Sequence, residues 1–258
     1  MNIRYWGRAL RSLGRHLPQK QFTKEWLTAG LAADDAPRAL SAHFFDVYPE
    51  IEGSRIPMGD VEYRIFNMDP LEQYCLASIA AVVQPRTIFE IGTYDGTTTL
   101  LLARAAPEAS LFTLDLPPDS RQDTDIDPHG AMEAAFSKVG GVGSRFRNAP
   151  ESARITQLYG DSRTFDFSEY LGRMDLVLVD GAHVYEVART DSENALLMLT
   201  PRGIAVWDDY APQWQGVVQA VDEAASRHGK TMWRLLPTEL AIYDPSKVPA
   251  GMDKRAST

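Results

Sequence analysis

The chain has 258 residues, 44% hydrophobic and 24% charged, so its composition is that of a packed globular protein and not of a disordered one. No segment approaches the roughly 18–20 consecutive apolar residues of a membrane span, and we expect no secretory signal because the first residues lack an apolar core. A single cysteine, Cys75, excludes an internal disulfide and any metal site built from several thiolates. These features lead us to expect a cytoplasmic protein.

The first 24 residues form a basic arm with six Lys or Arg residues and no acid. The rest of the chain holds 20 basic against 35 acidic residues, which argues against a nucleic-acid-binding surface there. Apolar residues recur in the arm at the spacing of an amphipathic helix: Ile3, Trp6, Leu10, Leu13 and Leu17. We expect this helix to pack on its own chain or on a second copy in a homo-oligomer, with an anionic membrane or another partner as the alternative.

Residues 1–68 comprise this arm and an irregular segment, which together we assign as an N-terminal cap. Regular structure begins with a helix whose first residues carry capping signals. Asp69 fits the N-cap, Pro70 the first helical position and Glu72 the capping box. Pro85 is predicted to end this helix.

After this helix, short apolar runs alternate with segments of helical periodicity. The predicted strands are residues 86–92, 110–116, 154–160, 174–180, 203–209, 231–236 and 239–243, and the predicted helices are residues 97–106, 130–139, 184–200 and 216–229. This alternation predicts an α/β fold: a Rossmann-like, doubly wound and mostly parallel seven-stranded sheet behind an N-terminal helical cap. The sheet domain is expected to span residues 69–245, followed by a tail at 246–258. In such sheets the ligand lies outside the carboxyl ends of the strands.

The first strand-to-helix turn has the features of a nucleoside site. Gly92 and Gly96 let the backbone approach a ligand closely, in the frame E-x-G-x-x-x-G. The G-x-G-x-x-G pattern of dinucleotide-binding proteins is missing. Asp115 ends the next strand, where an acid can accept hydrogen bonds from both ribose hydroxyls. A tight turn and a loop cap are the alternative for these residues, but the two features in register favour an adenosine-type ligand.

Three acids follow two later strands. Asp180 ends one strand, and Asp208 and Asp209 end the next, 28 and 29 residues further on. Adjacent parallel strand ends lie about 5 Å apart, so three carboxylates would crowd there. A hard divalent cation removes this cost, and oxygen ligands indicate Mg²⁺, or Ca²⁺ or Mn²⁺, and not zinc. In the alternative, Asp209 caps a turn and one acid points inward.

The segments "EIGTYDG", "LFTLDL", "YGDS" and "DLVLVDGAH" resemble, in order and position, the class I S-adenosylmethionine-dependent methyltransferases. The resemblance covers roughly residues 69–243. It implies that Asp115 holds the ribose and that Asp180 lies beside the sulfonium. It also implies contacts to the methionine and sugar from Glu90, Gly92, Thr93 and Tyr94, and contacts to the adenine from Asp161 and Ser162.

The spacing of the acids resembles the divalent-metal-dependent small-molecule O-methyltransferases. In that group an acid after the fourth strand and a pair after the fifth hold the metal, and a basic residue three positions after the first acid accepts a proton. His183 stands there in this chain, where the catechol enzymes have lysine. The alternative is that "DGAHVYE", including Glu186, merely begins a helix. The segment before residue 69 departs from the short N-terminus of the catechol enzymes, so their substrate class does not carry over.

Together these patterns predict methyl transfer from S-adenosylmethionine to a hydroxyl of a small molecule, either a sugar or a natural-product scaffold. The metal would lower the hydroxyl pKa and His183 would accept the proton. A non-catalytic cofactor-binding subunit, whose basic arm recruits a partner, is one alternative. A nicotinamide-dependent oxidoreductase is another, although the missing third glycine argues against it. The loop at 117–130 is either a lid or a solvated linker, and we favour the linker.

Overall fold

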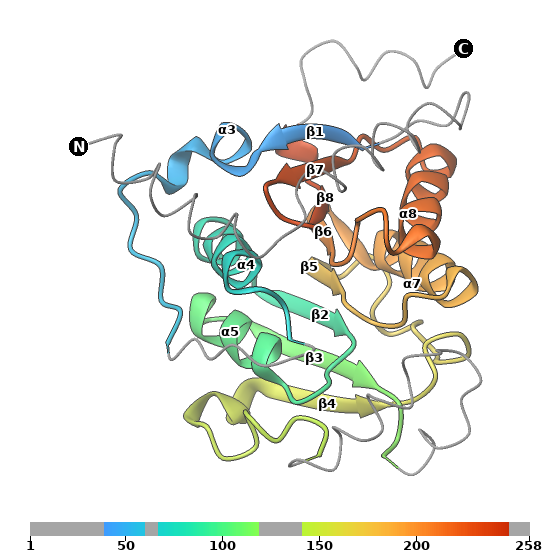
Figure 1. The fold of residues 1–258 in the computed structure, drawn as a ribbon. Coiled ribbons are helices and arrows are strands. Elements are labelled where there is room, and N and C mark those ends of the chain that lie inside the picture. Colours follow the sequence, from blue (N-terminus) through green and yellow to red (C-terminus); the bar gives the residue numbers. More distant parts are fainter. Residues whose placement is uncertain (1–38, 60–66, 119–140, 248–258) are drawn as a thin grey trace. The chain divides into compact units, whose positions relative to one another are not determined.

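A computed structural model describes residues 39–59, 67–118 and 141–247, which build an eight-stranded sheet with helices packed against it (Figure 1). The strand order is β1-β7-β8-β6-β5-β2-β3-β4. The strands are β1 (Leu40–His43), β2 (Thr87–Ile91), β3 (Ser110–Asp115), β4 (Ile155–Tyr159), β5 (Met174–Val179), β6 (Leu199–Trp207), β7 (Trp233–Leu236) and β8 (Ala241–Tyr243). The arm, the helix expected at 130–139, most of the 117–130 loop and the end of the tail lie outside the described residues.

The sheet contains all seven predicted strands and one more. The additional strand, β1, pairs with β7 at the edge of the sheet and comes from the segment that the sequence analysis treats as irregular. Its sequence, LSAH, has no apolar run, and its residues alternate between half-buried and exposed. Because the pairing with β7 creates this strand, and not an intrinsic β pattern, local periodicity does not reveal it.

Only β8 runs antiparallel to its neighbours among the described strands; every other pairing is parallel. The sheet is built outward in two directions from β2, which pairs with β3 on one side and β5 on the other. Between β2 and β5 the strand order reverses, and there the loops at the carboxyl ends diverge to leave a crevice. The mostly parallel, doubly wound architecture is therefore confirmed.

The helices cover the two faces of the sheet (Figure 1). They are α3 (Phe44–Val47), α4 (Pro70–Val83), α5 (Thr97–Ala105), α7 (Tyr185–Met198) and α8 (Gln215–Arg227), with short 3-10 segments η1 (Pro49–Ile51), η3 (Pro150–Arg154) and η4 (Pro245–Lys247). The crossovers through α5 and α7 run in opposite directions along the sheet, so right-handed connections place these helices on opposite faces. None of the helices in the described part of the chain is long and apolar enough to cross a membrane.

Helix α4 begins and ends as its sequence predicts. The Asp69 side chain accepts a hydrogen bond from the Leu71 backbone N–H at 2.8 Å. The Glu72 side chain in turn accepts one from the Asp69 backbone N–H at 3.0 Å, which completes a capping box. Gln84 takes a left-handed φ of 50° just before Pro85, where the helix ends. These local signals fix the start of α4 beside the carboxyl ends of the strands.

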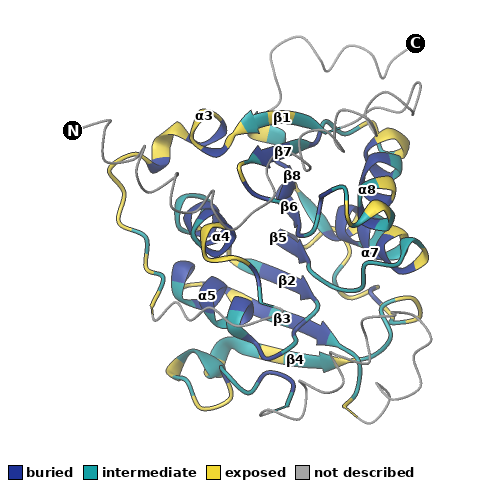
Figure 2. Ribbon diagram, viewed as in Figure 1, coloured by how far each residue is buried: buried dark blue, intermediate teal, exposed yellow. Residues whose placement is uncertain are grey.

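The central strands are buried on both faces, as Figure 2 shows for β2, β5 and β6. Ile88, Leu176 and Val206 are fully buried in the main core, which includes residues from β2, β5, β6, α4 and α5. Strand β4 lies at the opposite edge from β1 and is only partly covered. A sheet supported in this way holds its strand ends rigidly, and the polar side chains beyond those ends define the site.

Candidate active site at the carboxyl ends of the strands

The turn after β2 requires glycine at its first position. Gly92 has φ of 104°, and a Cβ at this residue would overlap the backbone carbonyl of Asp180. The Gly92 N–H donates to the Leu114 carbonyl at 2.9 Å, and the Asp180 N–H donates to the Ile91 carbonyl at 2.8 Å. Gly92 therefore brings the turn after β2 into direct contact with the first residue after β5.

Asp115 supports this turn from the end of β3. Its carboxylate accepts hydrogen bonds from the backbone N–H of Tyr94 and of Leu116, both at 2.7 Å. Tyr94 has a left-handed φ of 48°, which turns its N–H toward Asp115. Each Asp115 oxygen accepts one of these bonds, and a carboxylate oxygen can accept more than one hydrogen bond.

Glu90 lies beneath the turn and outside the cavity described below. It is fully buried, and its Oε2 accepts the hydroxyls of Thr99 and, at 2.5 Å, Thr113. Burial raises the pKa of Glu90 to about 8, although the two hydroxyls lower it. The Thr113 and Thr93 hydroxyls also share a hydrogen bond of 2.7 Å. Glu90 thus contributes to the site through the buried polar layer under the turn.

The three acids after β5 and β6 converge. One oxygen from each of Asp180, Asp208 and Asp209 lies within 4.8 Å of the others. Successive strand residues normally point to opposite faces, but Asp209 has a left-handed φ of 59°, and this break in the extended backbone allows both neighbours to face the same space. Burial, followed by the charges of Asp180 and Asp209, raises the pKa of Asp208 well above its ordinary value.

This donor set fits a hard divalent cation. The cluster consists of carboxylate oxygens, the ligands that Mg²⁺, Ca²⁺ and Mn²⁺ prefer. Asp208 is buried beside two further acids, so its charged form is disfavoured until a positive charge enters the cluster. The arrangement therefore meets both the chemical and the electrostatic requirement of such a site.

His183 joins the cluster from the loop before α7. Its Nε2 lies 2.5 Å from Asp209 Oδ2, and its ring stacks on Trp214, with centroids 4.1 Å apart and planes inclined by 22°. The Nδ1 atom is buried, so Nε2 is the nitrogen that faces the acids. Of the polar residues in "DGAHVYE", Asp180 and His183 are both at the site.

A cavity of about 370 Å³ contains these groups. It is lined by Asn67, Met68, Asp69, Glu72, Gly92, Thr93, Tyr94, Thr97, Thr98, Asp180, Gly181, His183, Asp208, Asp209 and Trp214. The lining residues with a formal charge are all acids. Burial raises the pKa of Glu72 to about 7, although backbone N–H groups of Glu239 and Asp69 bond to its carboxylate. Sequence reasoning identified the acids after the strands but missed Glu72 and Trp214 as cavity residues.

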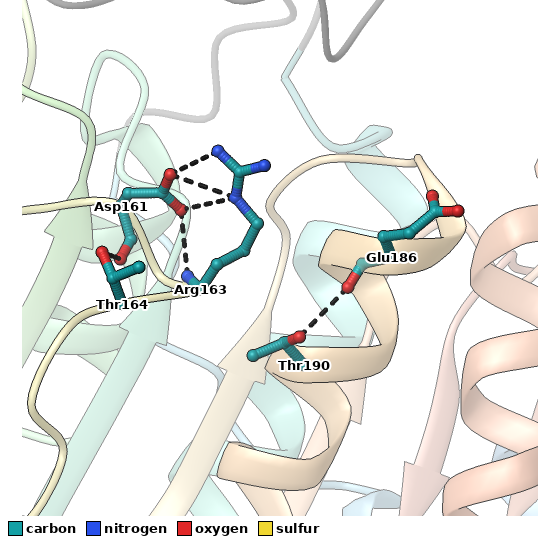
Figure 3. Close-up of polar contacts among 5 residues, drawn as sticks. All are labelled: Asp161, Arg163, Thr164, Glu186 and Thr190. Atoms are coloured by element: carbon teal, nitrogen blue, oxygen red, sulfur yellow. Dashed lines mark hydrogen bonds and ion pairs between the residues drawn. The ribbon is translucent and has the colours of Figure 1, made fainter.

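The turn after β4 has a different character (Figure 3). The Asp161 carboxylate accepts hydrogen bonds from Arg163 Nε at 2.9 and 3.0 Å and from Nη2 at 2.5 Å. The Arg163 guanidinium lowers the pKa of Asp161. Asp161 and Ser162 are half-buried and lie outside the lining of the cavity.

Figure 3 also shows Glu186 in the first turn of α7, where its carbonyl accepts the Thr190 hydroxyl at 3.1 Å. Glu186 is exposed and serves the helix, not the cavity.

Comparisons with known proteins agree with this arrangement. Residues 89–210 match a family model described as a methyltransferase domain. The O-methyltransferase TomG from Streptomyces achromogenes, solved with S-adenosylmethionine and involved in tomaymycin synthesis, is 19% identical, covers 88% of this chain and 98% of its own, and has a TM-score of 0.51. This likeness shows the fold.

Two further solved structures have lower TM-scores. The methyltransferase PaMTH1 from Podospora anserina, bound to S-adenosylhomocysteine, is 16% identical over 88% of this chain and 97% of its own, with a TM-score of 0.49. An O-methyltransferase from Bacillus cereus, bound to the same product, is 17% identical over 78% and 90%, with a TM-score of 0.46. A search of curated protein sequences finds no significant match.

Proposed function

From the match of residues 89–210 to a methyltransferase-domain model, we propose that the protein transfers a methyl group from S-adenosylmethionine to a hydroxyl of a small molecule, assisted by a divalent cation. The observation that carries the proposal is the meeting of Asp180, Asp208, Asp209 and His183 in one cavity, directly against the Gly92 turn. The residues proposed as metal ligands and as proton acceptor thus lie beside the turn proposed to hold the cofactor.

The cofactor is proposed to lie along the turn after β2. Gly92, Thr93, Tyr94 and Asp180 line the cavity and would contact its methionine and sugar, with Glu90 supporting the turn from below. When bound, S-adenosylmethionine supplies an electrophilic methyl group on a positively charged sulfur. Asp180 places negative charge on the side of the cavity where this sulfonium is expected.

The nucleoside would continue from the cavity toward β3 and β4. Asp115, at the end of β3 and against the Tyr94 turn, would accept the ribose hydroxyls. The adenine would lie against Asp161 and Ser162. Because Arg163 engages the carboxylate of Asp161, this turn would contact the base through its backbone and through Ser162.

The cation would be held by Asp180, Asp208 and Asp209. A divalent cation at such a site acts as a Lewis acid and lowers the pKa of a hydroxyl that it contacts. His183 would take the proton of this hydroxyl at Nε2, the nitrogen that contacts Asp209 in this structure, when the neutral ring carries its own proton on Nδ1. Asp209 thus keeps the imidazole directed at the cluster until the acceptor hydroxyl competes for the same nitrogen.

The acceptor is proposed to be neutral or positively charged. Every formally charged residue among the described lining is an acid, and Met68 and Trp214 add apolar surface. An acceptor with a carboxylate or a phosphate near its reacting hydroxyl would be repelled by this lining. A sugar or natural-product scaffold with two adjacent oxygens, both within reach of the cation and one of them methylated, satisfies these conditions.

A methyl-transfer assay with isotope-labelled S-adenosylmethionine and a panel of hydroxylated sugars and aromatic natural products tests the proposal. We expect label in at least one acceptor, loss of transfer in chelator, and recovery with added Mg²⁺. Calorimetry of cofactor binding in chelator provides the control, because the groups proposed to bind the nucleoside are separate from the three acids proposed to hold the cation. Cofactor binding without transfer to any acceptor would instead favour a non-catalytic subunit, and undiminished transfer in chelator would remove the metal.

A further inference from the structure

The imidazole of His183 is held by groups on both its edge and its face. Its Nε2 edge contacts Asp209 at 2.5 Å, and its face stacks on the Trp214 ring with a centroid separation of 4.1 Å. A single hydrogen bond leaves a ring free to rotate about the bonded nitrogen. An offset stack fixes the plane of the ring as well. Trp214 therefore supplies the constraint that Asp209 alone cannot give.

Trp214 is itself fixed by the start of α8. It is the N-cap residue of this helix, and its carbonyl accepts the N–H of Val217 at 3.0 Å and of Val218 at 3.1 Å. Its own N–H donates to the Ala211 carbonyl at 2.9 Å. The Trp214 backbone thus has little freedom, and its ring can serve as a stable platform.

The backbone of His183 also lies against α8. A Cβ at Gly216 would be 2.5 Å from the His183 carbonyl oxygen and 2.7 Å from the Tyr185 nitrogen, so glycine permits this close approach. The Tyr185 hydroxyl donates to Glu223 of α8 at 2.6 Å. Helix α8 is therefore in direct contact with the segment from His183 to Tyr185 through the backbone at Gly216 and through the side chain of Glu223.

The loop from Asp208 to Trp214 is also held by hydrogen bonds to Glu239. The Gln213 amide donates to both carboxylate oxygens of Glu239, at 2.7 and 2.8 Å, and the Tyr210 N–H donates to the Glu239 carbonyl at 2.8 Å. One anchored segment thus carries both Asp209 and Trp214, the two residues that contact the His183 ring.

We infer that Trp214 is a positioning residue of the reaction, whose ring holds the His183 imidazole in the plane in which Nε2 faces the acid cluster. The inference rests on the proposed role of His183 as proton acceptor. Misplacement of a reacting group by about 1 Å can lower a rate by roughly 10²-fold, so a tilted or rotating imidazole would slow methyl transfer without weakening cofactor binding.

A double-mutant cycle between Trp214→Leu and His183→Ala tests the inference in steady-state assays of the whole protein. We expect W214L to lower kcat by roughly 10-fold, part of the 10²-fold or more that a general base contributes, with unchanged S-adenosylmethionine affinity. In the H183A background W214L should cost almost nothing further, because Trp214 acts through His183. An equal loss in both backgrounds would assign Trp214 to acceptor contact and overturn the inference, as would full activity of W214L.

Three further variants provide the controls. Trp214→Phe keeps an aromatic face and should retain most of kcat. Trp233→Phe, on β7 and away from the cavity, should leave kcat unchanged. Gly216→Ala should displace the His183 backbone and lower kcat in the wild-type background but not in H183A, which keeps the test open if W214L folds poorly. A G216A enzyme with the wild-type rate would contradict the inference.

An NMR measurement separates this inference from the proposed function. In protein with ¹³C-labelled histidine, the His183 ring signals, assigned with H183A, should be displaced by the ring current of Trp214. They should return toward ordinary values in W214L and stay displaced in W214F. Undisplaced signals in the wild type would refute the stacking, independently of the measured activity. Displaced signals, with H183A as active as the wild type, would instead refute the role of His183 in the proposed function.

Discussion

Two neighbouring regions of the site surround their acids with different groups. Around the Gly92 turn, the carboxylates of Glu90 and Asp115 accept hydrogen bonds from nearby hydroxyl and backbone groups. After β5 and β6, Asp180, Asp208 and Asp209 crowd together and raise the pKa of Asp208. The backbone hydrogen bonds to Asp115 stabilise a turn, whereas the three crowded acids define a position for a positive charge. The regions should therefore respond differently to neutralisation.

The largest expected effect follows from neutralising the crowded region. Asp208→Asn should lower methyl transfer by roughly 10³-fold, because a Lewis acid contributes several kcal/mol to the rate. In chelator, the same change should raise the melting temperature, because it removes an ionisable carboxyl that is buried beside two further acids. Thermal melts and rates measured on one preparation check both results. An Asn variant that loses stability in chelator would show that the protein satisfies these acids after all.

The proton acceptor should have the next largest effect. His183→Ala is expected to lower kcat by roughly 10²-fold or more, with S-adenosylmethionine affinity unchanged. Raising the pH should partly restore the variant, since hydroxide can take the proton without imidazole. A rate equal to that of the wild type across the pH range would show that His183 is not the proton acceptor and has only a structural role beside α7.

The hydrogen-bonded region should show a smaller loss, confined to the cofactor. Asp115→Ala should weaken S-adenosylmethionine binding by about 1–3 kcal/mol, as charge-assisted hydrogen bonds to the ribose are lost. Asp115→Asn retains one acceptor oxygen and should lose less. Calorimetry compares the three proteins, with melting curves to measure any loosening of the Tyr94 turn. Equal cofactor affinity in all three would remove Asp115 from the ribose site.

The sequence predicts the central sheet and the acid cluster because both signals are local. An apolar run such as "MDLVLVD" indicates a buried strand, and the acid at its end needs only a parallel sheet to meet Asp208. Glu72 and Trp214 enter the cavity from α4 and from the start of α8, through packing that no spacing encodes. The Asp161–Arg163 ion pair is equally hidden, because an arginine two residues away could extend into solvent instead.

The smallest expected effect concerns Asp191, a buried acid outside both regions, whose substitution should change stability alone. Asp191 of α7 is 1% exposed, and its Oδ2 lies next to Gly181. Burial raises the pKa of Asp191 to about 7, although Ser162 and Arg163 lower it. The folded state therefore keeps its proton to a higher pH than the unfolded state, whose carboxyl has an ordinary pKa near 3.9.

Between about pH 4 and pH 7 the folded state binds more protons at Asp191 than the unfolded state does, so this residue makes the free energy of unfolding fall as pH rises, by at most about 1.4 kcal/mol per pH unit. Above pH 7 its contribution levels off. Asp191→Asn cannot titrate and should lose less stability over this window, so its stability relative to the wild type should increase from pH 5 to pH 7. Urea unfolding at several pH values measures the difference. Parallel curves would mean that Asp191 is ionised in the folded protein and stabilised there by its neighbours.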